Sequence, residues 1–266
     1  MADDTSEPDV GWPAWVELAT PQPDTARNFY RELFGWNVYT LTHPSYGDYD
    51  VFTLGDLQGP SVIGLRTLTD STQPASWTCF FFVEDLQVTV EIVKAGGGQE
   101  LIPPTHYTGG SAMAMCMDAQ GAEFGVGLRS EVLGPIVMNE PSAMCWVELA
   151  CHDVQQARRF YGKVFAWRTE DHEYQGHPYT VFRVGDRPVG GMVGMGGRWA
   201  ADHPARWIPY FWAEDCDATT AEAAELGARV RFPAEDIQVG RYSMMTDPTG
   251  APFAVMKPTS PGPGTT

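Results

Sequence analysis

The chain opens with a strand pattern followed by a helix pattern. Residues 15–19 place Trp, Glu and Ala on one side and Val and Leu on the other, which is typical of a β-strand. Apolar residues at helical spacing then lie between Asp24, a common N-cap residue, and Gly35, a common helix end: Ala26, Phe29, Tyr30, Leu33 and Phe34. The pattern predicts a strand and then an amphipathic helix over residues 24–34 that packs one face on a sheet.

Three more strands are expected at 36–41, 49–54 and 62–65, separated by turns rich in proline and glycine. The same order then begins again, with a strand at 77–83, a helix at 85–95 and strands near 100–102, 112–117 and 123–128. The glycines at 96–98 follow this helix instead of opening one, so they indicate a helix end and not a phosphate-binding loop. Residues 13–128 therefore predict two β-α-β-β-β modules.

The second part of the chain repeats the first. Trp15 returns as Trp146 and Phe29 as Phe160, a constant offset of 131 residues. Such a repeat indicates duplicated domains. We expect a flexible arm at 1–12, a first domain at 13–128, a linker at 129–141, a second domain at 142–257 and a disordered tail at 258–266.

Charge narrows the class of partner. The chain has 34 acidic and 17 basic residues, a formal net charge of −17, and no cluster of Lys or Arg. Such a chain repels phosphate backbones and anionic lipid, so we expect no nucleic acid and no membrane as partner. No apolar stretch approaches the ~20 residues of a membrane helix. The acidic start differs from a secretion signal, so we expect a cytoplasmic protein, as a monomer or a homodimer.

Several motifs together resemble a known superfamily. They are the opening strand, a helix that carries Phe-Tyr and ends Leu-Phe-Gly-Trp, a mid-domain strand that ends Val-x-Asp, and a closing Asp-x-x-Gly turn. This pattern looks like the vicinal oxygen chelate superfamily, which includes glyoxalase I, bleomycin-resistance proteins and extradiol dioxygenases. The resemblance covers 13–128 and 144–256. It implies an α+β fold of two tandem domains, each a pair of βαβββ modules whose curved mixed sheets enclose a cleft, but one scaffold hosts many reactions.

The resemblance also implies three places in each domain for the ligands of a divalent metal, usually His, Gln or Glu. Matched motif by motif, these places fall on Trp15, Thr78 and Gly125, and on Trp146, Ile208 and Ala254. A single Thr hydroxyl cannot hold a metal alone, and the other side chains offer no suitable oxygen or imidazole nitrogen. The five cysteines form no CxxC pair and no cluster with histidine. We therefore expect no metal and no other cofactor.

Strand parity instead places aromatic and apolar side chains where the metal would lie. The residues predicted to bind a ligand are Trp15, Thr78, Phe80 and Phe82 in the first half and Trp146, Ile208, Tyr210 and Trp212 in the second, with Tyr242 at a rim. An aromatic site with few polar groups favours a small hydrophobic or aromatic organic molecule as the partner.

Glu17 and Glu148 are the candidate catalytic residues. Each lies two residues after a repeated tryptophan and on the same side of its strand. A carboxylate beside Trp in a dry site has a raised pKa and can act as a general acid or base. The structural alternative is a salt bridge or hydrogen bond at the end of the strand.

Three functions fit this sequence. The first is a glyoxalase/bleomycin-resistance-like protein that binds a small hydrophobic compound without a metal and sequesters or carries it. The second is a metal-independent acid–base enzyme of isomerase, cyclase or lyase type in natural-product metabolism, which uses Glu17 or Glu148. The third keeps a metal through other ligands and catalyses glyoxalase or dioxygenase chemistry. The missing ligands count against the third function, and the sequence does not separate the first two.

Overall fold

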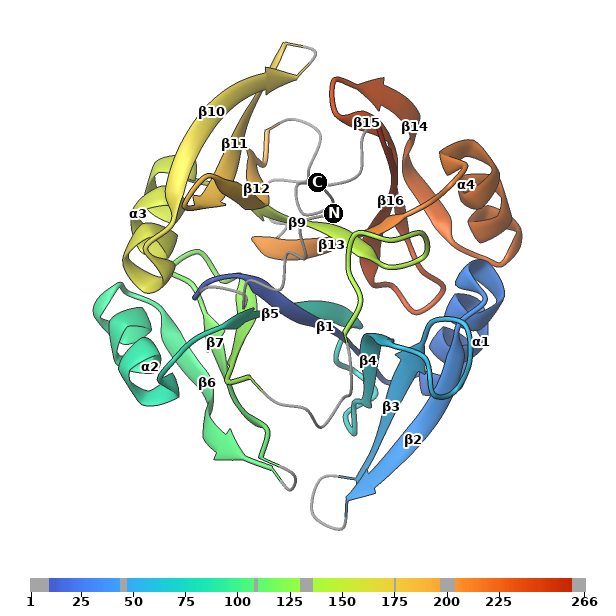
Figure 1. Ribbon diagram of the computed structural model, residues 1–266, viewed down its shortest axis with the longest axis horizontal. Helices are drawn as coiled ribbons and strands as arrows, with labels where there is room; N and C mark the ends of the chain where they lie inside the picture. The colour runs from blue at the N-terminus through green and yellow to red at the C-terminus, as the bar shows by residue number, and fades with distance from the viewer. Residues whose placement is uncertain are drawn as a thin grey trace, which may run out of the picture.

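The computed structural model describes residues 10–43, 47–107, 110–129, 136–174, 176–196 and 204–259. These residues form two eight-stranded sheets and four helices (Figure 1). The elements of the first half are β1 (Pro13–Thr20), α1 (Pro23–Phe34), β2 (Asn37–His43), β3 (Gly47–Thr53), β4 (Ser61–Thr67), β5 (Ser76–Phe82), α2 (Leu86–Ala95), β6 (Gln99–His106), β7 (Ala112–Met117) and β8 (Glu123–Gly127). Those of the second half are β9 (Met144–Cys151), α3 (Val154–Phe165), β10 (Arg168–Tyr174), β11 (His177–Val184), β12 (Arg187–Gly194), β13 (Arg206–Trp212), α4 (Cys216–Glu225), β14 (Arg229–Ile237), β15 (Gly240–Thr246) and β16 (Pro252–Pro258).

Each sheet is built from one half of the chain. The first has the order β2-β3-β4-β1-β5-β8-β7-β6, and the second repeats it as β10-β11-β12-β9-β13-β16-β15-β14. Each module contains one parallel pair, such as β1 with β4, and the two modules of a half join through an antiparallel pair, β1 with β5 or β9 with β13. The predicted α+β architecture of two tandem domains, each made of two βαβββ modules with mixed sheets, is confirmed.

The helices begin where local chemistry favours it, with one correction to the sequence expectation. Asp24 does not cap α1: Gln22 holds the N-cap position without a side-chain cap bond, and Pro23 is the first helical residue. Proline suits this position because its fixed φ is helical and its missing N–H would be unpaired there. Asp85, Asp153 and Asp215 do cap the other three helices. Among the described residues, no helix is both long and apolar enough to cross a membrane.

The two sheets pack back to back, and each half inserts an aromatic ring into the other. Phe81 of β5 lies with its ring centroid 5.0 to 5.2 Å from three rings of the second half, those of Phe165, Trp167 and Trp207. Phe211 of β13 lies 5.4 to 5.6 Å from three rings of the first half, those of Phe34, Trp36 and Trp77. Helices pair across the same junction, α1 beside α4 and α2 beside α3 (Figure 1). The two halves therefore share one core.

The segment before each half accepts a hydrogen bond from a tryptophan of the other half. The indole Nε1 of Trp167 donates to the carbonyl of Gly11 at 3.1 Å, and that of Trp36 donates to the carbonyl of Ser142 at 2.8 Å. Gly11 has a φ of +80°, and a Cβ atom there would lie 2.4 Å from the Trp167 nitrogen, so this position requires glycine. Most of the predicted arm and tail, at 1–9 and 260–266, and residues 130–135 of the predicted linker lie outside the described residues.

Two buried tyrosine–aspartate hydrogen bonds also cross between the halves. Tyr30 of α1 donates to Asp247 at 2.8 Å, and Tyr161 of α3 donates to Asp118 at 3.0 Å. Each aspartate uses its other oxygen to accept the backbone N–H groups of its own Asp-x-x-Gly turn. The Asx-type turn bonds expected from the sequence are therefore present. Each aspartate also accepts a hydrogen bond from a tyrosine on a helix of the opposite half.

Removing one tyrosine hydroxyl tests this junction. The Tyr161 hydroxyl donates to Asp118 and also accepts from Nε1 of Trp207 at 2.9 Å. Tyr161→Phe therefore leaves both of these buried groups without the hydrogen bond to this hydroxyl. We expect the free energy of unfolding, measured by urea denaturation, to fall by about 2 kcal/mol. The matched control Tyr174→Phe, at the half-buried end of β10, should change it by less than about 0.5 kcal/mol. An unchanged stability of Tyr161→Phe would contradict this account of the junction.

Candidate functional site

Each sheet has an inner face, defined here as the face that carries Trp15 and Glu17 in the first half and Trp146 and Glu148 in the second. The residues between them on the strands, such as Val16 and Val147, belong to the shared core on the opposite face. The register sets Trp15 opposite Phe80 and Glu17 opposite Thr78 in the first half. In the second half it sets Trp146 opposite Tyr210 and Glu148 opposite Ile208. The parity predicted from the sequence therefore brings these residues together.

On the first inner face, Glu17 is an ion-paired carboxylate. Its side chain is buried, with 4% of the residue exposed, and its Oε1 accepts from Nε of Arg66 at 2.9 Å. Tyr49 of β3 also bonds to Glu17, while the Tyr49 hydroxyl accepts from Nε1 of Trp15 at 2.9 Å. The indole, the phenol, the carboxylate and the guanidinium thus form one chain of hydrogen bonds across three strands.

The second inner face repeats this chain of bonds without the guanidinium. Nε1 of Trp146 donates to the hydroxyl of Tyr179 at 2.8 Å, and the hydroxyls of Tyr179 and Tyr210 both donate to Glu148. Glu148 has 7% of its residue surface exposed. Burial raises the pKa of Glu148 to about 7, although the two tyrosine hydrogen bonds oppose the rise. The candidate site therefore holds a carboxyl group that changes its charge near neutral pH.

Glycine makes room for both tyrosine hydroxyls. Gly64 pairs with Glu17 and Gly191 pairs with Glu148 in the parallel strand pairs. A Cβ atom would lie 1.9 Å from the Tyr49 hydroxyl at Gly64 and 2.1 Å from the Tyr179 hydroxyl at Gly191. Any larger residue at these positions would displace the phenol that binds the carboxyl group.

The remaining predicted ligand residues surround these bonds to different extents. Phe80 lies in the apolar cluster of the first inner face, and Phe82 packs against that cluster. Thr78 is 2% exposed opposite Glu17. Ile208 and Tyr210 lie in the cluster of the second inner face, with Trp146 and Tyr242 packed against it, whereas Trp212 is half-buried and not part of that cluster. The hydroxyl of Tyr242 bonds to Glu235 at 2.7 Å.

The positions where the family's metal ligands would lie do not offer the required donors. Phe80 pairs with Gly125, and a Cβ atom on Gly125 would lie 2.1 Å from Cδ1 of Phe80, so the ring fills the space that a ligand side chain would need. In the second half the corresponding strand carries Ala254, which pairs with Tyr210. No group of three or more His, Cys, Asp or Glu side chains that could hold a metal ion occurs within the described ranges. The residues present do not fit the metal that the resemblance implies.

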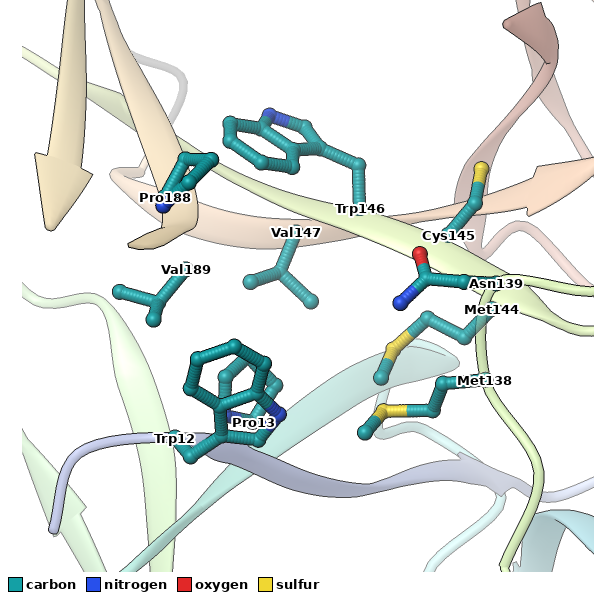
Figure 2. Close-up of a pocket in the computed structure, with 10 residues that line it drawn as sticks. All are labelled: Trp12, Pro13, Met138, Asn139, Met144, Cys145, Trp146, Val147, Pro188 and Val189. Carbon is teal, nitrogen blue, oxygen red and sulfur yellow. The ribbon is translucent and has the colours of Figure 1, made fainter. Parts of the chain in front are cut away.

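A pocket lies between the two halves. It is open to solvent and is lined by Trp12, Pro13, Met138, Asn139, Met144, Cys145, Trp146, Val147, Pro188 and Val189 (Figure 2). Of the predicted ligand residues only Trp146 lines it, and its indole extends away from Trp12 and Pro13 (Figure 2). Arg187 covers the Trp12 ring at 4.4 Å from its centroid. The lining contains one amide and no carboxylate, so acid–base chemistry is not expected in this pocket.

Sequence reasoning did not identify Tyr49, Tyr179 and Arg66 as parts of the site. Arg66 comes from β4, which pairs with β1, whereas Tyr49 and Tyr179 come from β3 and β11, one strand further out in each sheet. Their distance along the chain from Glu17 and Glu148 hides this proximity. One signal was available for the tyrosines. Tyr49 and Tyr179 begin matching segments of the repeat, and a repeated polar aromatic residue beside a repeated carboxylate is a site candidate.

Comparisons with known proteins agree with this fold. Residues 12–126 match the family model of the Glyoxalase/Bleomycin resistance protein/Dioxygenase superfamily, and residues 146–256 match that of the Glyoxalase-like domain. The chain is 32% identical over 263 residues to the "Putative glyoxylase CFP32" of Mycobacterium tuberculosis, which covers 95% of this chain and 97% of that protein. It is 30% identical over 258 residues to the "Anthracycline biosynthesis protein DnrV" of Streptomyces peucetius, which covers 93% of each chain.

Solved structures of low sequence identity share the fold. A Mn(II)-bound glyoxalase from Novosphingobium aromaticivorans aligns with a TM-score of 0.65 at 14% identity, over 94% of this chain and 82% of that one. The 2,3-dioxygenase LapB from Pseudomonas sp. KL28 aligns with a TM-score of 0.64 at 13% identity, over 96% of each chain. At these identities the likeness extends to the fold alone.

The stability of a Glu148→Gln variant tests the charge state of the site. The carboxyl pKa is about 7 in the folded protein and near 4.5 in an unfolded chain. Below the lower value both states are protonated, but as the pH rises through 7 the folded protein must bury a charge, so Glu148 costs stability at high pH. Between about pH 5 and pH 8, the free energy of unfolding of the variant should therefore gain roughly 2–3 kcal/mol relative to the unmodified protein, measured by urea denaturation.

Glu17→Gln is the matched control from the other half. Because it removes the carboxylate partner of Arg66, it should lower the free energy of unfolding at about pH 8, which is the opposite sign. A difference between Glu148→Gln and the unmodified protein that does not change with pH would contradict the assigned pKa of Glu148.

Proposed function

The chain belongs to the glyoxalase/bleomycin resistance protein/dioxygenase superfamily, and we propose that it binds a small aromatic or hydrophobic organic molecule on its second inner face and transfers protons on that molecule through Glu148, without a metal. The observation that carries this proposal is the environment of Glu148. Its carboxyl group is buried, receives two tyrosine hydrogen bonds and has a pKa of about 7.

A carboxyl group with this pKa suits general acid–base catalysis at neutral pH, because it can both take and return a proton. As the carboxylate, Glu148 would remove a proton from a carbon next to a carbonyl group of the ligand. As the acid, it would return the proton to another atom of the same ligand. The hydroxyls of Tyr179 and Tyr210 hold the carboxyl group in place during both steps. This sequence of steps is an isomerisation, and the same groups can serve a cyclisation or an elimination.

The surroundings of Glu148 favour an aromatic ligand. Trp146, Tyr210 and Tyr242 come from three different strands and offer ring surface with few polar atoms. A relative named as an anthracycline biosynthesis protein is in keeping with this class, since anthracyclines are polycyclic aromatic ketones. We assign the first inner face a binding or structural role, because Glu17 is already engaged by Arg66.

Metal content tests one part of the proposal. The protein, produced in medium that contains Mn, Fe, Ni and Zn, should hold far less than one atom of any of these metals per chain, because the inner faces lack the donor set. The measurement is elemental analysis of the purified protein. Near-stoichiometric metal that resists dialysis would contradict metal-independent function.

Proton transfer is tested with aromatic ketones of two to four fused rings. Binding is followed by quenching of tryptophan fluorescence, and exchange of protons next to the carbonyl group is followed by NMR in D₂O. Glu148→Gln should keep the dissociation constant of the best-bound ketone within about three-fold and slow its exchange at least ~100-fold. Glu222→Gln, an exposed carboxylate on α4, is the control and should leave both unchanged.

The outcomes separate an enzyme from a binding protein. Exchange that survives in Glu148→Gln while binding persists would contradict the catalytic role and leave the binding role. Absence of quenching by every ketone would contradict the ligand class. Loss of exchange in Glu17→Gln but not in Glu148→Gln would move the chemistry to the first half.

A further inference from the structure

The duplicated halves differ at a strand position beside the buried carboxyl group. In the first half Arg66 of β4 pairs with Ala19, two residues beyond Glu17 on β1. In the second half Val193 of β12 pairs with Ala150, two residues beyond Glu148 on β9. The two positions are equivalent in strand, register and face. Arg66 reaches back to Glu17 at 2.9 Å, whereas Val193 packs against the apolar cluster that contains Ile208 and Tyr210.

We propose that Val193 is a tuning residue that reserves the second half for proton transfer, because it withholds from Glu148 the guanidinium that Arg66 supplies to Glu17. This inference rests on the proposed role of Glu148 and extends it by naming the residue that controls that role. An arginine at position 193 would fix Glu148 as an ion-paired carboxylate. It would give Glu148 the kind of ion pair that Glu17 has in the first half.

The groups that hydrogen-bond to Glu148 are neutral at pH 7, and the cation Arg206 lies on the same face of the sheet. Tyr179 approaches from β11 and Tyr210 from β13, with Tyr174 of β10 and Tyr242 of β15 behind them. The Cys151 thiol, on the same strand, keeps its proton because burial raises its pKa to about 12. Arg206 of β13 pairs with Ala150, but it does not shift the pKa of Glu148. Within the described chain, no cation is therefore among the groups that set the charge of Glu148.

A second difference supports the same division between the halves. Phe80, opposite Trp15, is replaced by Tyr210, opposite Trp146. The hydroxyl of Tyr210 donates to Glu148, whereas a phenylalanine ring has no donor. In the second half the neutral hydroxyl of Tyr210 thus takes the place of the charged guanidinium of Arg66 as a donor to the carboxyl group. A neutral donor holds the carboxyl group in place without fixing its charge, which is what a group that cycles between acid and base requires.

Val193→Arg in the full-length protein tests the inference, with Val193→Met as a neutral control of similar reach. The carboxyl carbons of ¹³C-labelled glutamate are followed by NMR against pH, and Glu148→Gln assigns the signal of Glu148. We expect the Glu148 midpoint to fall by about 2 pH units in Val193→Arg and by less than about 0.5 in Val193→Met. Exchange of the aromatic ketone probe at pH 7 should fall at least ~10-fold in Val193→Arg alone, with its binding retained.

Arg66→Val is the reciprocal variant and decides the question if Val193→Arg does not fold. It leaves the buried Glu17 carboxylate without its cation, so the urea concentration at the midpoint of unfolding should fall at about pH 8 relative to the unmodified protein. A folded Val193→Arg with an unmoved Glu148 midpoint, or Arg66→Val with an unchanged urea midpoint at about pH 8, overturns the inference while leaving the proposed function intact. If the exchange in the unmodified protein does not depend on Glu148, the proposed function fails instead, whichever way the midpoints move.

Discussion

A carboxyl group buried among apolar side chains needs either a cation beside it or a proton on it, and both inner faces of this protein are built around that need. The duplicated strand places a glutamate two residues after a tryptophan in each half. In each half a tyrosine, from β3 or β11, hydrogen-bonds to both that tryptophan and that glutamate. The first half then supplies Arg66 as the cation. The second half supplies a second tyrosine, and its glutamate has a pKa near neutrality. One duplicated arrangement thus gives two carboxyl groups of different chemical character.

The shared core keeps these two faces independent. Because Phe81 and Phe211 each insert into aromatic rings of the opposite half, the backs of the sheets are joined and the inner faces are turned away from each other. The tyrosine–aspartate bonds attach a helix of each half to a turn of the other. Substitutions on one inner face, such as the change from arginine to valine, therefore need not disturb the other. This independence is a physical basis on which duplicated halves acquire different roles.

Sequence patterning predicted the architecture well because each module is a local unit with a strict period. The alternation at residues 15–19 placed Trp15 and Glu17 on one face, and the register confirms it. The predicted start of α1 was wrong: Asp24 suits an N-cap, but Pro23, one residue earlier, suits the first helical position equally well, and the helix begins there. Tyr49, Arg66 and Val193 could not be assigned, since their roles depend on which strands pair and in what register. The same holds for Gly64 and Gly191, which matter only because a phenol lies over each.

The family's scaffold is associated with metal chemistry, whereas this chain places a phenylalanine ring and an alanine where ligands would have to project. Isotope-edited infrared spectroscopy of ¹³C-glutamate-labelled protein at about pH 6 tests the central claim most directly, since it separates neutral from ionised carboxyl groups. A neutral carboxylic acid band that disappears in Glu148→Gln is the predicted result. A spectrum in which all glutamates are ionised at that pH, with no difference between the two proteins, would contradict the account.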